Sequence, residues 1–164
     1  MPHIIDTELA LLEGWRDQIV QDDPDVLTGY NIDGFEWEYI NARASKLDRT
    51  RTSRFFWLGR LTRLAANFAT SASSSKAHGS NNTARFDAAG RINFDLFTFI
   101  KKDASYTLDS YKLAAVSQKF LGDDKDDMPI KDMFAHYLSG DPDRRFLVAK
   151  YCLKDTLLPI RLMQ

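Results

Sequence analysis

The chain has 164 residues, of which 44% are hydrophobic, and its formal net charge is −1. This length suits one domain or part of one, and the many aromatic residues supply enough apolar surface for a packed core. The balanced charge gives no overall basic surface that would by itself indicate nucleic-acid binding. The single cysteine, Cys152, excludes an internal disulfide and fits a reducing compartment. No apolar run approaches the roughly 20 residues that a membrane-spanning helix needs, so no membrane is expected as a partner.

The first predicted element is an amphipathic helix. Asp6 or Thr7 can cap its N-terminus, and Glu8 in its first turn suits the helix dipole. Apolar residues then recur at helical spacing up to Ile19. Pro24 cannot continue a helix, so we expect the helix to end before it.

The stretch 23–40 predicts a strand, a tight turn and a second helix. A short apolar run at 26–28 suits a strand. Gly29 and Gly34 bracket a sharp bend, where a residue without a Cβ can adopt backbone angles that other residues avoid. A helix over about 34–47 follows, with aromatic residues on one side. In α/β folds, ligands bind where a strand ends and a helix begins.

The segment from Asp48 to Arg63 is basic, with five arginines interleaved with Phe55, Phe56 and Trp57. Basic residues among aromatics can hold single-stranded nucleic acid by stacking and phosphate contact. The alternative is a strand that buries its aromatics in the core and leaves its arginines in solvent. The apolar run beginning at Phe55 favours this second interpretation.

Small and polar residues dominate 69–82, and we expect a variable surface loop over 70–84. Two short strands are predicted next, over 85–90 and 91–95. Asp95 is then expected to cap a helix.

The C-terminal half is expected to be helix-rich. Ser105 or Thr107 caps one helix, which Gly122 ends, and Pro129 opens a short one. Asp141 caps the last helix, which has a proline in its first turn.

This last helix carries Asp155 on an otherwise apolar face. The residues that share the face by the i, i+3, i+4 rule are Val148, Tyr151, Cys152, Leu158 and Leu162. A buried carboxylate is costly unless it is paired or binds a metal. Tyr151 lies one turn earlier, so its hydroxyl can reach the group that Asp155 serves. The alternative is a salt bridge from Asp155 to Arg145 or Arg43, and the pattern alone leaves both interpretations open.

Two blocks resemble motifs of a known family. The block 23–40, with Thr-Gly-Tyr-Asn-Ile followed by Phe and an acid, resembles the second exonuclease motif of family B DNA polymerases, closest to the eukaryotic delta type and its large-DNA-virus relatives. The block 144–162, with Tyr-x-x-x-Asp on a helix, resembles the third motif. The segments 90–96, 105–108 and 120–122 match the linking blocks in the same order. The resemblance therefore covers nearly the whole chain.

The resemblance implies an α/β fold of the ribonuclease H-like type, with a helix-rich C-terminal half. The family's first motif, Asp-x-Glu on an opening strand, is missing, since Asp6 and Glu8 have the spacing but open a helix. The palm and fingers motifs of the polymerase are missing as well. We therefore expect residues 1–164 to form a single partial 3′–5′ exonuclease domain, either an internal piece of a larger polymerase or a truncated reading frame.

By resemblance, the site hydrolyses a phosphodiester bond with two Mg²⁺ or Mn²⁺ ions in the complete domain. Asp155 and Glu36 are implied as metal ligands and Tyr151 as the residue that orients the attacking water. Glu36 stands where the family usually has Asp; the extra methylene moves the carboxylate by about 1 Å, which can cost on the order of a hundredfold in rate. Asn31 and Phe35 match positions that line the cleft for the single-stranded 3′ end.

The resemblance thus implies part of a DNA-directed DNA polymerase that excises mismatched 3′ ends, with little activity in the isolated chain. Its implied partners are DNA, the remainder of the polymerase chain and accessory replication subunits, inside the cell in the nucleus or at a viral replication site. An alternative is a non-catalytic module that supports polymerase or nucleic-acid contacts. A third interpretation is a helical protein-interaction domain. The nuclease hypothesis requires Glu36 and Asp155 to converge on one acidic pocket.

Overall fold

A computed structural model of the chain describes residues 6–61, 64–75, 79–123 and 128–164. The chain divides into two compact units, Met1–Asp95 and Leu96–Gln164. Among the residues that the structure covers, no helix is long and apolar enough to cross a membrane.

The first unit begins with helix α1 (Glu8–Asp22). The hydroxyl of Thr7 accepts a hydrogen bond from the backbone N–H of Ala10 at 3.2 Å, which confirms the predicted cap. The helix ends at Asp23, whose φ of 46° lies in the left-handed region and turns the chain toward the first strand. The predicted start and stop of this helix are both confirmed, because they depend on local chemistry.

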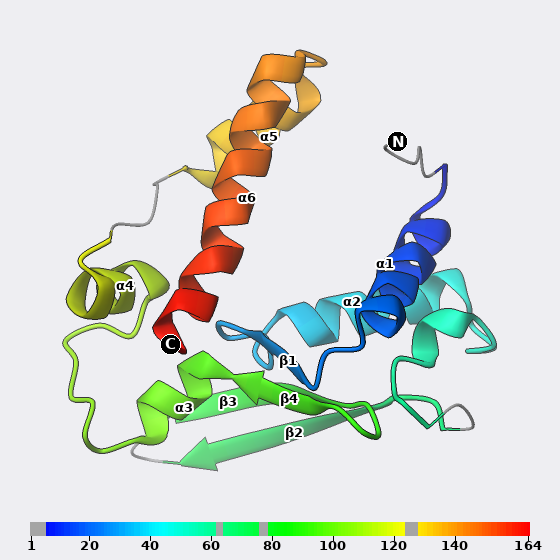
Figure 1. Cartoon of the computed structure of the whole chain (residues 1–164), viewed down its shortest axis with the longest axis horizontal. Helices are drawn as coiled ribbons and strands as arrows, with labels where there is room; N and C mark the ends of the chain where they lie inside the picture. The colour runs from blue at the N-terminus through cyan, green and yellow to red at the C-terminus, as the bar shows by residue number, and fades with distance from the viewer. Residues whose placement is uncertain (1–5, 62–63, 76–78, 124–127) are drawn as a thin grey trace. The chain divides into compact units, whose positions relative to one another are not determined.

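Strands β1 (Val26–Gly29) and β4 (Ile92–Asp95) form a two-stranded parallel sheet (Figure 1). The register pairs Gly29 with Asp95, so the carboxyl ends of the two strands lie side by side. Between them the chain passes through a helix and a hairpin, since a parallel pair needs a long crossover.

The second sheet is an antiparallel hairpin of β2 (Asn67–Ser75) and β3 (Gly79–Asp87) (Figure 1). Within 70–84, where a variable surface loop was expected, the structure has paired strands, although residues 76–78 lie outside the described part. The variability and surface position of this stretch stay predictions. Its Ser, Ala and Asn residues show no alternation of apolar and polar side chains, so no periodic pattern predicts strands here.

Helix α2 spans Glu36–Leu47, within two residues of its predicted start. Its inward side carries Trp37 and Ala44, which are 5% and 0% exposed. Phe35 and Tyr39, which the sequence placed together on one side, are both exposed and stack on each other with ring centroids 5.8 Å apart. The helix therefore faces the core with Trp37 and Ala44, and not with Phe35 and Tyr39.

Aromatic rings build the core of the first unit. Trp37 stacks on Phe86 of β3 with centroids 4.5 Å apart, and Phe86 contacts Phe68 of β2 at 4.7 Å. The other buried apolar members of this cluster are Ala44, Phe55, Phe56, Leu58, Ala66 and Ala88. The base of the hairpin is thus anchored on α2.

The basic segment forms a short 3₁₀ helix, η1 (Arg54–Phe56), where the sequence predicted a strand. Phe55 and Phe56 are fully buried but Trp57 is 45% exposed, so the predicted burial is confirmed for two of the three aromatics, and the predicted strand is wrong. The hydroxyl of Ser53 accepts the N–H of Phe55 at 3.2 Å and so caps a helical turn. This turn sets the two adjacent rings edge to face, 5.2 Å apart, and both reach the core.

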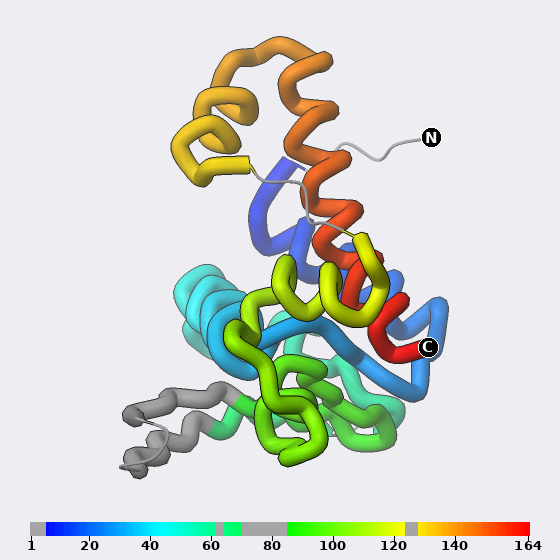
Figure 2. The backbone as a smooth tube through the Cα atoms, turned by 90° about the vertical axis from the view of Figure 1, so that its left-hand side faces the viewer, coloured from blue at the N-terminus to red at the C-terminus, as the bar shows by residue number. Residues whose placement is uncertain are grey.

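The second unit is helical, as expected. Its helices are α3 (Leu96–Lys102), α4 (Leu113–Leu121), α5 (Ile130–Leu138) and α6 (Pro142–Leu162). Helices α5 and α6 lie side by side (Figure 1, Figure 2), and α4 also packs on α6. The carboxylate of Asp123, just after α4, pairs with Lys154 and Arg161 of α6. These ion pairs tie the end of α4 to the last helix.

The helix ends follow the predicted caps at most positions. Gly122 ends α4 with a φ of 63°, and the side chain of Asp141 accepts the N–H of Asp143 at 2.9 Å to cap α6. The predicted start of α4 is wrong, because the helix begins only at Leu113. Instead of capping a helix, Ser105 closes a turn in which its N–H donates to the Asp103 carboxylate at 2.9 Å.

Candidate functional site

The turn between β1 and α2 lies at the edge where the carboxyl ends of β1 and β4 meet. The N–H of Gly34 donates to the carbonyl of Asn31 at 3.0 Å, and the N–H of Trp37 donates to the carbonyl of Ile32 at 3.1 Å. The φ of Asn31 is 62°, a left-handed conformation that Asn adopts more readily than most residues. The positive φ of this bend therefore falls on Asn31, and not on the glycines that bracket it.

Gly29 and Gly34 are needed for space. A Cβ on Gly29 would lie 2.4 Å from Cγ2 of Ile32, and a Cβ on Gly34 would lie 2.5 Å from Oδ1 of Asn31. Neither glycine has a positive φ. The prediction of a glycine-bracketed turn is confirmed, but its stated reason is wrong: the close approach of neighbouring side chains, and not the backbone angle, favours glycine here.

Asp95, at the end of β4, holds the turn. Its side chain is buried, and the residue is 6% exposed. Oδ1 accepts the backbone N–H of Asn31 at 2.8 Å, and Oδ2 accepts the backbone N–H of Asp33 at 3.3 Å. The helix-capping role expected of Asp95 stays a prediction. The contacts of Asp95 with the turn are a second, separate role of this side chain.

Asn93 makes the second set of contacts from β4 to the turn. Its Oδ1 accepts the indole N–H of Trp37 at 2.9 Å, and its Nδ2 donates to Oδ1 of Asp33 at 2.7 Å. Asn93 and Asp95 are alternate residues of one strand, so their side chains project from the same face. Two polar residues of β4 therefore bind both the turn and the first turn of α2.

Glu36 is the first residue of α2 and follows the turn directly. Although its side chain reaches solvent, the surrounding protein partly desolvates the carboxylate, and this raises the pKa of Glu36 above its ordinary value. A backbone N–H that bonds the carboxylate works against the rise, and the charge of Asp95 adds to it. Burial and the same Asp95 charge raise the pKa of Tyr30 to about 12. The turn is thus an electronegative environment.

On α6, Tyr151 and Asp155 lie one turn apart, and both are half-buried. Leu158 continues the same face and is almost fully buried, whereas Cys152 is exposed, so the predicted inward face of this helix is confirmed only in part. The two arginines suggested as partners of Asp155 bind other groups. Arg43 forms a two-pronged ion pair with Glu8, and Arg145 donates to the carbonyl of Tyr137 at 3.2 Å.

The residues expected at the site fall into two groups, one in each unit. Asn31, Phe35 and Glu36 lie in or beside one turn of the first unit, and Tyr151 and Asp155 share a face of α6 in the second. The convergence of Glu36 with Asp155 joins the two units and stays a prediction. Within the described part of the chain, no three His, Cys, Asp or Glu side chains gather as metal ligands.

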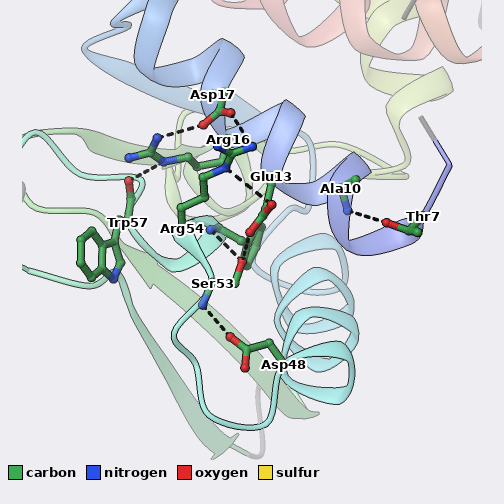
Figure 3. Close-up of polar contacts among 10 residues, drawn as sticks. Thr7, Ala10, Glu13, Arg16, Asp17, Asp48, Ser53, Arg54 and Trp57 are labelled. Atoms are coloured by element: carbon green, nitrogen blue, oxygen red, sulfur yellow. Dashed lines mark hydrogen bonds and ion pairs between the residues drawn. The ribbon is translucent and has the colours of Figure 1, made fainter. Parts of the chain in front are cut away.

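The basic segment is bound to α1 through its polar side chains (Figure 3). Arg54 pairs with Glu13 at 3.5 Å and with Asp17 at 3.2 Å, and Ser53 donates to Glu13 at 2.7 Å. Arg16 of α1 donates to the backbone carbonyl of Trp57, in the same segment, at 2.8 Å. These contacts give the arginine and the serine a structural role. Binding of single-stranded nucleic acid by this segment stays a prediction.

A further polar cluster holds the start of β1 against the start of β4. The side chain of Arg91 is 2% exposed; it donates to the carbonyls of Leu58 at 2.9 Å and Pro24 at 2.6 Å, and pairs with Asp23 at 3.0 Å. Arg60 also pairs with Asp23, and this pair first, then the pair with Arg91, lowers the pKa of Asp23. Sequence reasoning missed this cluster, because its members lie on three separate segments.

Comparison with known proteins agrees with the resemblance seen in the sequence. Residues 3–116 match the family model for "DNA polymerase family B, exonuclease domain". The chain belongs to this family, and its mixed helices and strands agree with an α/β exonuclease domain.

Several curated relatives are DNA polymerase delta catalytic subunits. Those of Plasmodium falciparum (isolate K1 / Thailand), Caenorhabditis elegans and Mesocricetus auratus are 39%, 38% and 36% identical to this chain, over 95%, 95% and 96% of its length. The chain spans 14% of the length of each of these relatives. The similarity therefore covers nearly all of this chain but only a small part of each subunit.

Proposed function

We propose that the chain is part of a DNA-directed DNA polymerase and contributes a proofreading 3′–5′ exonuclease domain. Its fold would be a partial ribonuclease H-like domain without the opening strands that carry the first motif. The observation that carries this proposal is the turn at 30–36, which sets an acidic residue at the carboxyl ends of two parallel strands, where α/β folds bind ligands. The family match, which includes this part of the chain, supports an exonuclease role for that position.

The two carboxylates proposed as ligands have the chemistry that a divalent cation needs. Glu36 and Asp155 offer carboxylate oxygens, the donors that Mg²⁺ and Mn²⁺ prefer. Desolvation and the charge of Asp95 raise the pKa of Glu36, so a cation at this carboxylate would relieve an unfavourable charge. When bound, a pair of such ions would activate water and stabilise the leaving 3′ oxygen.

Three other residues would serve the substrate. Tyr151, one helical turn from Asp155, would accept or donate a hydrogen bond to the attacking water and so orient it. Phe35 is 61% exposed and would offer its ring to an unpaired base. Asn31 would line the same cleft, where the single-stranded 3′ end lies.

The rest of a polymerase chain would supply the first motif and the polymerising domains. The partners would be DNA and accessory replication subunits, in the nucleus or at a viral replication site. The alternative is a non-catalytic module of the polymerase that keeps the fold for structural or nucleic-acid contacts. The longer side chain of Glu36, where the family usually has Asp, favours this alternative.

The test is Mg²⁺-dependent excision of a mismatched 3′ end by the complete polymerase that contains this segment. Asp155→Ala should lower excision by at least about a hundredfold, since even residues that only support a metal ligand can matter that much. Asp143→Ala, on the first turn of the same helix, is the matched control and should leave excision unchanged. Excision that survives Asp155→Ala within a fewfold would exclude the two-metal role of Asp155.

The isolated 164-residue chain should show little excision. Robust activity from it, abolished by Asp155→Ala, would overturn the interpretation as a partial domain. If the complete polymerase polymerises but never excises, the non-catalytic alternative holds.

A further inference from the structure

Strand β4 presents Asn93 and Asp95 to the turn that precedes Glu36. Together these side chains make contacts with three turn or helix residues: the N–H groups of Asn31 and Asp33, the carboxylate of Asp33, and the indole of Trp37. Asp95 is buried while making them. Buried polar groups with satisfied hydrogen bonds rigidify the segments they join.

We propose that Asn93 and Asp95 are positioning residues, which fix the turn at 30–36 and thereby orient the Glu36 carboxylate. The inference rests on the proposed function, because it assigns Glu36 a role in the reaction. Neither residue is proposed to touch the substrate or a metal ion. They act through the backbone of the turn and through the start of α2.

The chemistry of Asp95 suits this role and that of a neutral analogue does not. Two backbone N–H donors point at its two oxygens, 2.8 Å and 3.3 Å away. An ionised carboxylate accepts at both oxygens, whereas a carboxamide accepts at one and presents donors at the other. Asp95→Asn would keep the size of the side chain but set an N–H group against another N–H group.

The contacts bear directly on Glu36 because of where they fall. Asn31 adopts a left-handed backbone, which is unfavourable for most residues and persists when surrounding contacts enforce it. Trp37, the residue after Glu36, is held by Asn93 at 2.9 Å. Glu36 thus lies between two residues, Asn31 and Trp37, that hydrogen bonds from β4 hold in place. A shift of about 1 Å at a reacting group can cost on the order of a hundredfold in rate.

The test combines two measurements on Asp95→Asn. The first is excision by the complete polymerase over a series of Mg²⁺ concentrations, with polymerisation on the same chain as the internal reference. We expect excision to fall by roughly ten- to a hundredfold, with more Mg²⁺ needed for half-maximal rate, and polymerisation to stay unchanged. A merely structural role would lower both activities together.

The matched control is Asp48→Asn. Its carboxylate also accepts two backbone N–H groups, of Ser53 at 2.6 Å and of Thr50 at 3.1 Å, but it closes the turn after α2. The same chemical change in the same unit should leave excision within about threefold, because separated sites act independently.

The second measurement is amide hydrogen exchange of Asn31 and Asp33 in the 164-residue chain, which needs no nuclease activity. Asp95→Asn should speed exchange at both amides by about tenfold or more, as expected for the loss of a hydrogen bond to a charged acceptor. Faster exchange with impaired excision supports the inference. Unchanged exchange, or faster exchange with full excision, overturns it while the proposed function stands. A wild-type polymerase without excision refutes the proposed function, and the positioning role falls with it.

Discussion

Replacing Arg91 with methionine should destabilise the first unit more than any other single loss of charge considered for it. The guanidinium is buried, with 2% of the side chain exposed, and bridges three segments. It donates to the carbonyls of Leu58 and Pro24 at 2.9 Å and 2.6 Å. Methionine fills similar space but donates nothing, so both carbonyls would lose their charged donor.

The cost follows from these contacts. A hydrogen bond from a charged group contributes about 1.5–3 kcal/mol, and a buried acceptor that loses its donor also loses its compensation for desolvation. Asp23 adds little, because Arg60 still binds it at 2.8 Å and it remains accessible to solvent. The two carbonyls together therefore predict a loss of roughly 3–5 kcal/mol. That is a large share of the 5–15 kcal/mol by which domains are typically stable, so Arg91→Met should unfold at a much lower urea concentration.

Tryptophan fluorescence during urea unfolding is the assay. All three tryptophans, Trp15, Trp37 and Trp57, belong to the first unit, so the signal reports on that unit. Arg91→Lys should recover part of the stability, since a lysine keeps the charge but lacks the planar fork of donors. Arg60→Met, which removes the more exposed arginine of the same cluster, should cost less. An Arg91→Met chain within about 1 kcal/mol of wild type would refute the reasoning, because that is the scale of a solvent-exposed ion pair.

Two more perturbations test local features. Thr7→Ala removes the hydroxyl that accepts the N–H of Ala10 and should cost about 1 kcal/mol in urea unfolding, whereas Thr7→Ser should keep most of it; equal stability of the two variants would contradict the cap. Glu36→Gln should stabilise the chain at pH 7, by less than about 1 kcal/mol because the side chain reaches solvent. The pKa of Glu36 is raised in the folded state, so the ionised form opposes folding. The contribution of Glu36 to wild-type stability is therefore fully present below pH 4.5 and is lost as the pH rises through the folded pKa. The gain from Glu36→Gln over wild type should therefore disappear in acid, with Glu38→Gln as the control on the same helix turn; a gain that persists at pH 4 would contradict the shift.

Features that depend on neighbouring residues were predicted well. The caps at Thr7 and Asp141 and the glycine end at Gly122 follow from groups within a few residues of each other. The misses have tertiary causes. The strands over 67–87 pair with each other and are anchored at their base in the core, and the turn at 54–56 curls because both of its rings are drawn inward.

The candidate site also has a part that neighbouring residues predict and a part that depends on tertiary contacts. Asn31, Phe35 and Glu36 are close in sequence, so one motif was enough to place them in one turn. Asn93 and Asp95 reach that turn only because β4 pairs with β1 in parallel and in a specific register. A slip of one residue would point both side chains to the opposite face, and no local pattern fixes that register. The alternation of polar residues along β4 was the one available signal for them.

The register of β1 and β4 links the shape of the turn to its charge. Pairing Gly29 with Asp95 sets a buried carboxylate under backbone N–H groups that need an acceptor, and this stabilises a left-handed Asn31. The same carboxylate lies close enough to Glu36 to raise its pKa. One residue therefore binds the turn before Glu36 and adds to the cost that desolvation imposes on the ionised form of Glu36. A cation at Glu36 would offset that cost, and this is the electrostatic basis of the metal-binding role proposed for Glu36.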